Sequence, residues 1–271
     1  MCWVIPVFAK VMEVRKANRA KLGGFEAPAD HVKAREKTDK SLADLETFLA
    51  NRQQDGQAKN SDPLDLAPSV AKLEAAWQAT ASAGNGADSD GRTVFEPVTA
   101  ALSDLLVKVG DDANLVPDPD IDSFYLVNAL VLTMPTAAEE VGQVWGWGTS
   151  LVTKGGTDER SGKRFNRGSA KAQTKLAEAR TNFGRSIAVN ESLKNKLDLA
   201  PLTAADAFTV ATVAAVEAGQ RDAAKIYASG QAAKQKPRLH DASGAFYFQS
   251  LGWLMGLEPT TTGITILDST N

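Results

Sequence analysis

Three aspartates in this chain have the spacing of oxygen ligands for a calcium ion. Asp118, Asp120 and Asp122 alternate along one short stretch, with Pro119 and Ile121 in the gaps. A calcium loop also needs a central glycine and a distal glutamate, and the stretch has neither. The competing interpretation is that Asp120 or Asp122 caps a new helix, whose positive end favours acidic side chains. We therefore predict a helix start here and no metal site.

A second stretch, residues 154–164, contains glycines and cations in the manner of a phosphate-binding loop. Arg164 stands where such a loop needs Ser or Thr to bind magnesium, and no strand pattern precedes the stretch. Gly146 and Gly148 flank Trp147, but the third glycine of a dinucleotide-binding motif is missing. The pattern predicts a solvated turn before a long helix, without a bound nucleotide.

Histidine and cysteine are scarce in the chain. His31 and His240 are the two histidines, and Cys2 is the single cysteine. Neither histidine belongs to a zinc-binding helix motif, and no Ser-His-Asp or Cys-His set is evident. A single cysteine also excludes an internal disulfide framework. We predict a protein that is not an enzyme and that needs no cofactor and no metal.

Composition favours helices and argues against nucleic-acid binding. Of the 271 residues, 43% are hydrophobic, and alanine is frequent, as in helical proteins. The 30 basic and 33 acidic residues give a net charge of -3, whereas nucleic-acid binders have a basic excess. No uninterrupted run reaches the ~18 to 20 apolar residues that a membrane span requires.

Apolar residues recur at helical spacing along most of the chain and predict a series of amphipathic helices. The predicted helices cover residues 29–53, 69–83, 97–110, 122–144, 157–197 and 203–237. Pro135 lies inside the fourth, which is either kinked there or divided into two helices. The spacing of Phe124, Val131 and Met134 predicts that this segment is a core helix.

Trp145 and Trp147 are two residues apart and therefore point to different faces of one helix. We predict that one is buried and that the other lies at a rim or a contact surface. Gly142, Gly146 and Gly148 have a small-residue spacing, which either permits another helix to approach closely or loosens the helix end.

Long amphipathic helices joined by short turns bury their apolar stripes side by side. The predicted fold is therefore an all-α, elongated antiparallel bundle of the four-helix type. We expect the bundle over residues 25–236. Residues 1–24 are expected to form an N-terminal helix, either a small helix face or the end of a membrane helix, and residues 237–271 an irregular tail.

The segment from Asp118 to Pro135 reads Asp-Pro-Asp-x-Asp-Ser-Phe-Tyr-Leu, followed by an apolar run and a proline. It resembles the periplasmic sensory domain of bacterial methyl-accepting chemotaxis proteins and of HAMP-linked sensor kinases. Residues 142–146 and 157–160 are similar to the helices that follow in that family, and the loose likeness extends over roughly residues 5–235. The resemblance implies a ligand-sensing bundle between two membrane helices, which dimerises and passes a small motion inward.

The same resemblance implies a small-molecule ligand or a periplasmic binding protein as partner, and an inner-membrane location for the intact receptor. Ligands in helical bundles sit between helices, and Tyr125, Asn128 and Trp145 are the candidate ligand-binding residues. Core packing and helix capping are the alternative roles for these three side chains.

Both ends depart from the family pattern. Trp3 to Phe8 resembles the last turns of a first membrane helix, and no second membrane helix, HAMP segment or signalling domain follows. Residues 256–266 resemble the translated antisense strand of a transfer-RNA gene, so we expect a truncated receptor, soluble as it stands, with a read-through tail. The alternative is a free-standing helical scaffold protein that acts through its surface.

Overall fold

The computed structural model describes residues 7, 10, 11, 14, 15, 31–54, 66–82, 94–112, 120–155 and 158–233. Within these ranges every regular element is a helix and no strand occurs, so the predicted all-α class is confirmed. The predicted helix over 1–24 is covered at five positions only. The predicted tail over 237–271 lies outside the described residues, as do Cys2, His240, Asp118 and Thr157.

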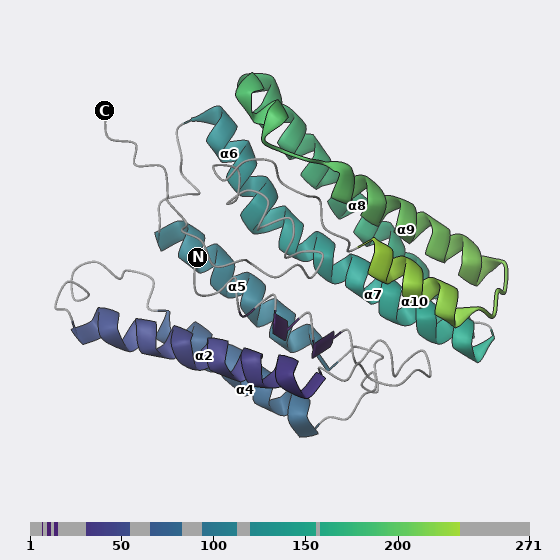
Figure 1. Cartoon of the computed structure of the whole chain (residues 1–271), viewed down its shortest axis with the longest axis horizontal. Coiled ribbons are helices and arrows are strands. Elements are labelled where there is room, and N and C mark those ends of the chain that lie inside the picture. The colour runs from purple at the N-terminus through teal and green to yellow at the C-terminus, as the bar shows by residue number, and fades with distance from the viewer. Residues whose placement is uncertain are drawn as a thin grey trace.

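The helices follow one another in a simple order along the chain (Figure 1). Their bounds are α2 His31–Gln54, α4 Ala67–Ser82, α5 Glu96–Asp112, α6 Ile121–Val127, η1 Asn128–Thr133, α7 Met134–Lys154, α8 Glu159–Val189, η2 Glu191–Asn195, α9 Ala200–Glu217 and α10 Ala223–Ala232. The element η1 is a π-helical segment and η2 is a short 3-10 helix.

The first three helices form one packed group, in which α2 lies against α4 and α4 against α5. Their predicted apolar stripes contribute to a common buried cluster that includes the fully buried Trp77, and the helical residues Val7, Val11 and Val14 belong to the same cluster. The helix α5 continues through Gly110, where the sequence predicted its end. A glycine inside a helix costs only about 1 kcal/mol relative to alanine, which the surrounding packing offsets.

The elements α6, η1 and α7 form one continuous helix that passes Pro135. The backbone N–H of Met134 donates to the carbonyl of Ala129, five residues back instead of four. This wide turn lies directly before the proline, which lacks an N–H and would clash with the carbonyl of a regular helix. The helix is therefore neither ended nor divided by Pro135. At its start, Phe124 is 41% exposed, so the prediction that this side chain belongs to the core is wrong.

The remaining helices pack along this continuous helix, with α8 and α9 beside it and beside each other, and α10 against α7 (Figure 1). Two predicted helices end earlier than expected. The helix α8 stops at Val189 because Asn190 has an extended backbone, and the predicted helix over 203–237 turns at Gly219, whose φ is +63°. Such a positive φ suits glycine and ends a helix.

Close packing between α7 and α9 requires Gly148. A Cβ atom at this position would lie 2.3 Å from Cγ2 of Thr212, so the small residue permits the approach of α9. This finding selects close helix approach over a loosened helix end for Gly148.

Among the described residues, one helix is long and apolar enough to cross a membrane by length and composition. It is the continuous helix Ile121–Lys154, with 34 residues, in which an 18-residue window has a mean hydropathy of 1.2. The helix packs against α5, α8, α9 and α10, and buried core helices have the same length and composition.

Candidate ligand pocket between α7 and α8

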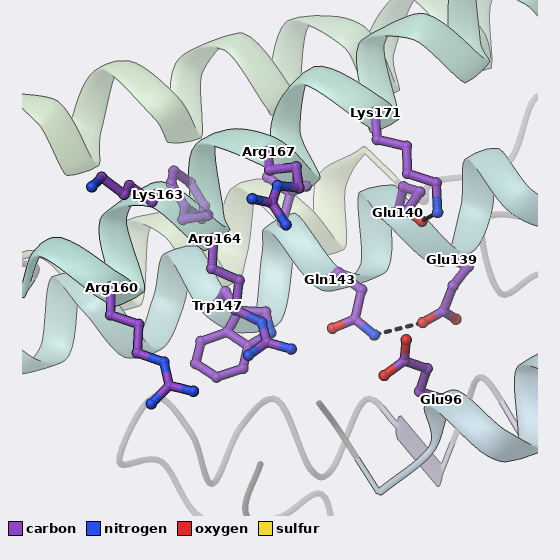
Figure 2. Close-up of a pocket in the computed structure, with 13 residues that line it drawn as sticks. Glu96, Glu139, Glu140, Gln143, Trp147, Arg160, Lys163, Arg164, Arg167 and Lys171 are labelled. Carbon is purple, nitrogen blue, oxygen red and sulfur yellow. Dashed lines mark hydrogen bonds and ion pairs between the residues drawn. The ribbon is translucent and has the colours of Figure 1, made fainter. Parts of the chain in front are cut away.

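A pocket of about 560 Å³ opens between α7 and the first half of α8, with the start of α5 at one edge (Figure 2). This volume suits a small-molecule ligand. The lining residues are Glu96, Glu139, Glu140, Gln143, Val144, Trp147, Arg160, Lys163, Arg164, Phe165, Arg167, Gly168 and Lys171.

The α8 wall is strongly cationic because basic residues recur on one face of the helix. Residues 160, 163, 164, 167 and 171 are all Arg or Lys, at spacings of three and four that place them on the same side. Asp158 begins this helix: its carboxylate accepts from the backbone N–H of Ser161 at 2.9 Å and from the Ser161 hydroxyl at 2.7 Å. These hydrogen bonds lower the pKa of Asp158. The wall is therefore set by a well-defined helix start.

Two of the basic residues on this face of α8, Lys163 and Lys171, form ion pairs with glutamates. Lys163 pairs with Glu159 at 2.6 Å on the solvent side, and Lys171 pairs with Glu140 on α7. Arg160 and Arg167 are exposed, and no ion pair joins either of them to another described residue. Arg164 lies over the Trp147 ring, with the guanidinium carbon 5.5 Å from the ring centroid. The guanidinium groups of Arg160 and Arg167 thus remain without a carboxylate partner among the described residues.

The α7 wall contains acidic residues whose charges are already balanced. Glu139 accepts from Nη2 of Arg15 at 3.0 Å and from Nε2 of Gln143 at 2.6 Å. Arg15 also pairs with the second carboxylate oxygen of Glu139, so the pair is bidentate. Glu96, at the start of α5, lies at the same end of the pocket (Figure 2). The pocket is therefore polarised, with guanidinium groups on α8 and the carboxylate of Glu96 at the α5 edge.

The floor of the pocket is apolar. Val144 and Phe165 are buried beneath it, and the partly buried Trp147 presents its ring to the pocket. Gly168 leaves space, because a Cβ atom at this position would meet nothing within 4 Å. Cations above an apolar floor can bind an organic anion. No cluster of three or more residues that could hold a metal ion occurs among the described residues.

The predicted division of the two tryptophans is confirmed, with a consequence for the candidate site. Trp145 is 2% exposed and its ring packs on Tyr227, with the centroids 5.4 Å apart. Gly230 lies so close that a Cβ there would be 2.5 Å from the indole. Trp147, by contrast, lines the pocket. Of this pair, the sequence selected the buried Trp145 as a ligand residue and missed Trp147, whose only sequence signal was its position two residues on.

The other two predicted ligand residues lie elsewhere along the same continuous helix. Tyr125 is packed edge-to-face on Phe124 and lies under the guanidinium of Arg185, at 5.3 Å. The side-chain oxygen of Asn128 accepts from Asn182 at 3.0 Å. About 25 Å of helix separates Asn128 from Trp145, at ~1.5 Å per residue. The three predicted residues therefore do not line one pocket.

Asn128 belongs to a row of hydrogen bonds, here called the polar seam, that joins α6 and η1 to α8. The hydroxyl of Thr133 lies 3.3 Å from the Asn128 oxygen and 3.4 Å from the carboxylate of Glu178. Further along, the Ser186 hydroxyl donates to the Asp122 carbonyl at 2.8 Å. The Asn190 amide donates to the Asp122 carboxylate, also at 2.8 Å. Asp120 occupies the N-cap position without a side-chain cap bond, and Asp122 holds α8 instead.

In comparisons with known proteins, no family model, no curated protein and no solved structure matches the chain.

Proposed function

We propose that this protein is a signal-input domain that binds a small molecule without catalysing a reaction, of the type found in bacterial chemoreceptors and sensor kinases. The observation that carries the proposal is the polarised pocket between α7 and α8. Ligand pockets in all-α domains lie between helices and combine apolar walls with a few polar groups. The resemblance of the segment from Asp118 to Pro135 to chemoreceptor sensory domains adds the receptor context.

The proposal includes an elongated antiparallel bundle of the four-helix type as its architecture. Support comes from α7, α8 and α9, which lie side by side and are joined by short connections at residues 155–158 and 190–199. Short connections between long neighbouring helices make them antiparallel. In this proposal the bundle is periplasmic, and the intact receptor is a homodimer in the inner membrane.

A route from the pocket toward the N-terminus supports a role in signalling. Glu139, in the pocket wall, forms the bidentate pair with Arg15, which belongs to the N-terminal region. The family resemblance implies that a membrane helix precedes this region. Ligand binding that shifts α7 relative to α8 would therefore act directly on the segment that leads to the membrane.

A thermal-shift screen tests the proposal. Amino acids, organic acids and nitrate are added separately to the purified chain, and the melting temperature is followed by circular dichroism. A ligand that binds only the folded state stabilises it by RT ln(1 + L/Kd), where L is the free ligand concentration, so the melting temperature rises with the logarithm of the ligand excess over Kd. A concentration-dependent rise with one compound class is the expected result, and the absence of a shift with every class would contradict small-molecule sensing.

A second candidate function is that of a helical scaffold that acts through its surface. The observation favouring it is that Ile121, Phe124 and Val189 are exposed at the end of the molecule where α6 meets the end of α8. Light scattering of the wild type and of Phe124→Ser distinguishes the two functions. A stable assembly that Phe124→Ser disrupts, with no thermal shift from any small molecule, would favour the scaffold.

A further inference from the structure

The charge distribution in the pocket makes a specific prediction about the ligand. Arg160, Arg164 and Arg167 lie on one face of α8, at spacings of four and three residues. Like charges at these spacings repel one another and destabilise a helix. An anion bound between them would relieve that repulsion, and each guanidinium can donate two parallel hydrogen bonds to a carboxylate.

The described lining of the pocket offers a cation no comparable cluster of carboxylates. The carboxylates of Glu139 and Glu140 are neutralised by Arg15 and Lys171. Glu96 is exposed at the far edge of the pocket. Its charge opposes an anion at that edge and so favours placing the anionic group next to the arginines of α8.

The apolar floor of the pocket indicates the chemistry of the uncharged part of the ligand. Trp147 presents an aromatic ring, Val144 and Phe165 make the base apolar, and the missing side chain at Gly168 leaves room above them. A flat apolar group would fill this space and remove it from water, which is favourable in proportion to the buried area.

We propose that the pocket binds a small carboxylate with a flat aromatic body, with its carboxylate at Arg160 and Arg167 and its ring against Trp147 above Gly168. The proposal rests on the ligand-sensing function and names its ligand class. The guanidinium carbon of Arg164 lies 5.5 Å from the Trp147 ring centroid and adds positive charge beside the ring position.

The test compares four probes of the intact chain by isothermal titration calorimetry. Benzoate has the ring and the charge, benzamide the ring without the charge, benzylamine the ring with the opposite charge, and acetate the charge without the ring. Benzoate is expected to bind at least about tenfold more tightly than each of the others. Its affinity should fall as salt rises from about 50 to about 500 mM, because screening weakens contacts between charges near the surface.

Variants test the location of the site. Arg160→Gln and Arg167→Gln should each weaken benzoate binding about tenfold. Neither variant should lower the melting temperature of the unliganded protein, because each removes a repulsive charge. A merely structural role for these arginines would give the opposite pattern.

Gly168→Leu should abolish binding by filling the pocket. Gly184→Leu is the matched control, because Gly184 lies on the same helix, also has open space around it, and lies outside the pocket. Benzoate that binds no better than benzylamine or acetate, or that binds Gly168→Leu as tightly as the wild type, would overturn the proposal. If another compound class raises the melting temperature and Gly168→Leu removes that effect, the sensing function stands while the carboxylate assignment fails. If no compound binds, both fail.

Discussion

Two carboxyl groups meet where α2 packs on α4, and they make stability depend on pH. Burial, a hydrogen bond with Glu46 and the charge of Glu46 raise the pKa of Glu74 from 4.5 to about 7. A carboxyl group whose pKa is raised by folding stabilises the fold below its unfolded pKa, and this contribution is lost as pH rises through the folded pKa. The melting temperature should therefore fall between pH 5 and pH 8. Glu74→Gln should reduce this slope, whereas Glu36→Gln on the exposed face of α2 should leave it unchanged.

Gly230 tests the packing around the buried tryptophan. Gly230→Ala would force a methyl group against the rigid Trp145 ring, at 2.5 Å, and should lower the free energy of unfolding by about 1 to 3 kcal/mol. Gly184→Ala meets nothing within 4 Å and should raise it by about 1 kcal/mol, because alanine favours helix. Urea unfolding measures both. Equal stability of the two variants would contradict the packing described for Trp145.

For single residues, the sequence predicted features that depend on local spacing, but it did not predict which side chains line the pocket. The division of Trp145 and Trp147 between two helix faces followed from their spacing. Which of them would be buried did not, because that depends on Tyr227 and Gly230, far along the chain. Arg164 stands where a phosphate-binding loop needs Ser or Thr, so the sequence argued against a nucleotide site. Its contact with Trp147 could not be predicted, because it depends on how α7 aligns with α8.

Between helices, the polar seam specifies how α8 lies on α6 and η1. Asn182→Leu would leave the amide of Asn128 without this partner and should cost about 1 to 3 kcal/mol of unfolding free energy. The double variant Asn128→Leu with Asn182→Leu should cost less than the sum of the single variants, because neither polar group is then stranded. Thr181→Ala, on the exposed neighbouring position of α8, is the control. If the losses of unfolding free energy in the two single variants add up in the double variant, the side chains of Asn128 and Asn182 do not interact, which would contradict the polar seam.

Helix existence followed from apolar spacing, while several helix ends did not. The stripes over α2 and α4 predicted buried residues correctly because their period is regular. The turn at Gly219 was missed because alanine and charged residues continue a helical composition on both sides of it. The end of α8 at Asn190 was missed for a similar reason: Leu193 and Leu197 keep the helical spacing, although they pack from a 3-10 turn.

Across the whole molecule, the pair of Arg15 and Glu139 joins the group of α2, α4 and α5 to the helices that follow. Arg15 is 4% exposed and Glu139 16%. Arg15→Ala would leave a mostly buried carboxylate uncompensated and should cost about 3 kcal/mol. Lys72→Ala breaks the exposed pair with Asp104 and should cost at most about 1 kcal/mol. Urea unfolding compares the two, and an equal, small loss in both would show that the pair does not join the two groups.

Composition was sufficient for the all-α class, because no part of the sequence alternates with a strand period and alanine is frequent. The bundle type, the dimer and the receptor context rest on the proposal above. The pocket itself could not be read from the sequence, since its walls come from α5, α7 and α8 and only packing assembles them.

The wide turn before Pro135 has a consequence for the ancestry of the chain. A backbone bond that spans five residues in place of four means that this helix contains one residue more than a regular helix of the same reach. The extra residue makes room for the proline, because the wider turn accommodates a residue that cannot donate a backbone hydrogen bond. We therefore expect relatives, once aligned, to gain or lose the two together. A homologue with another residue at the position of Pro135 should have a single-residue gap between positions 128 and 133, whereas one that keeps the proline should keep the full length.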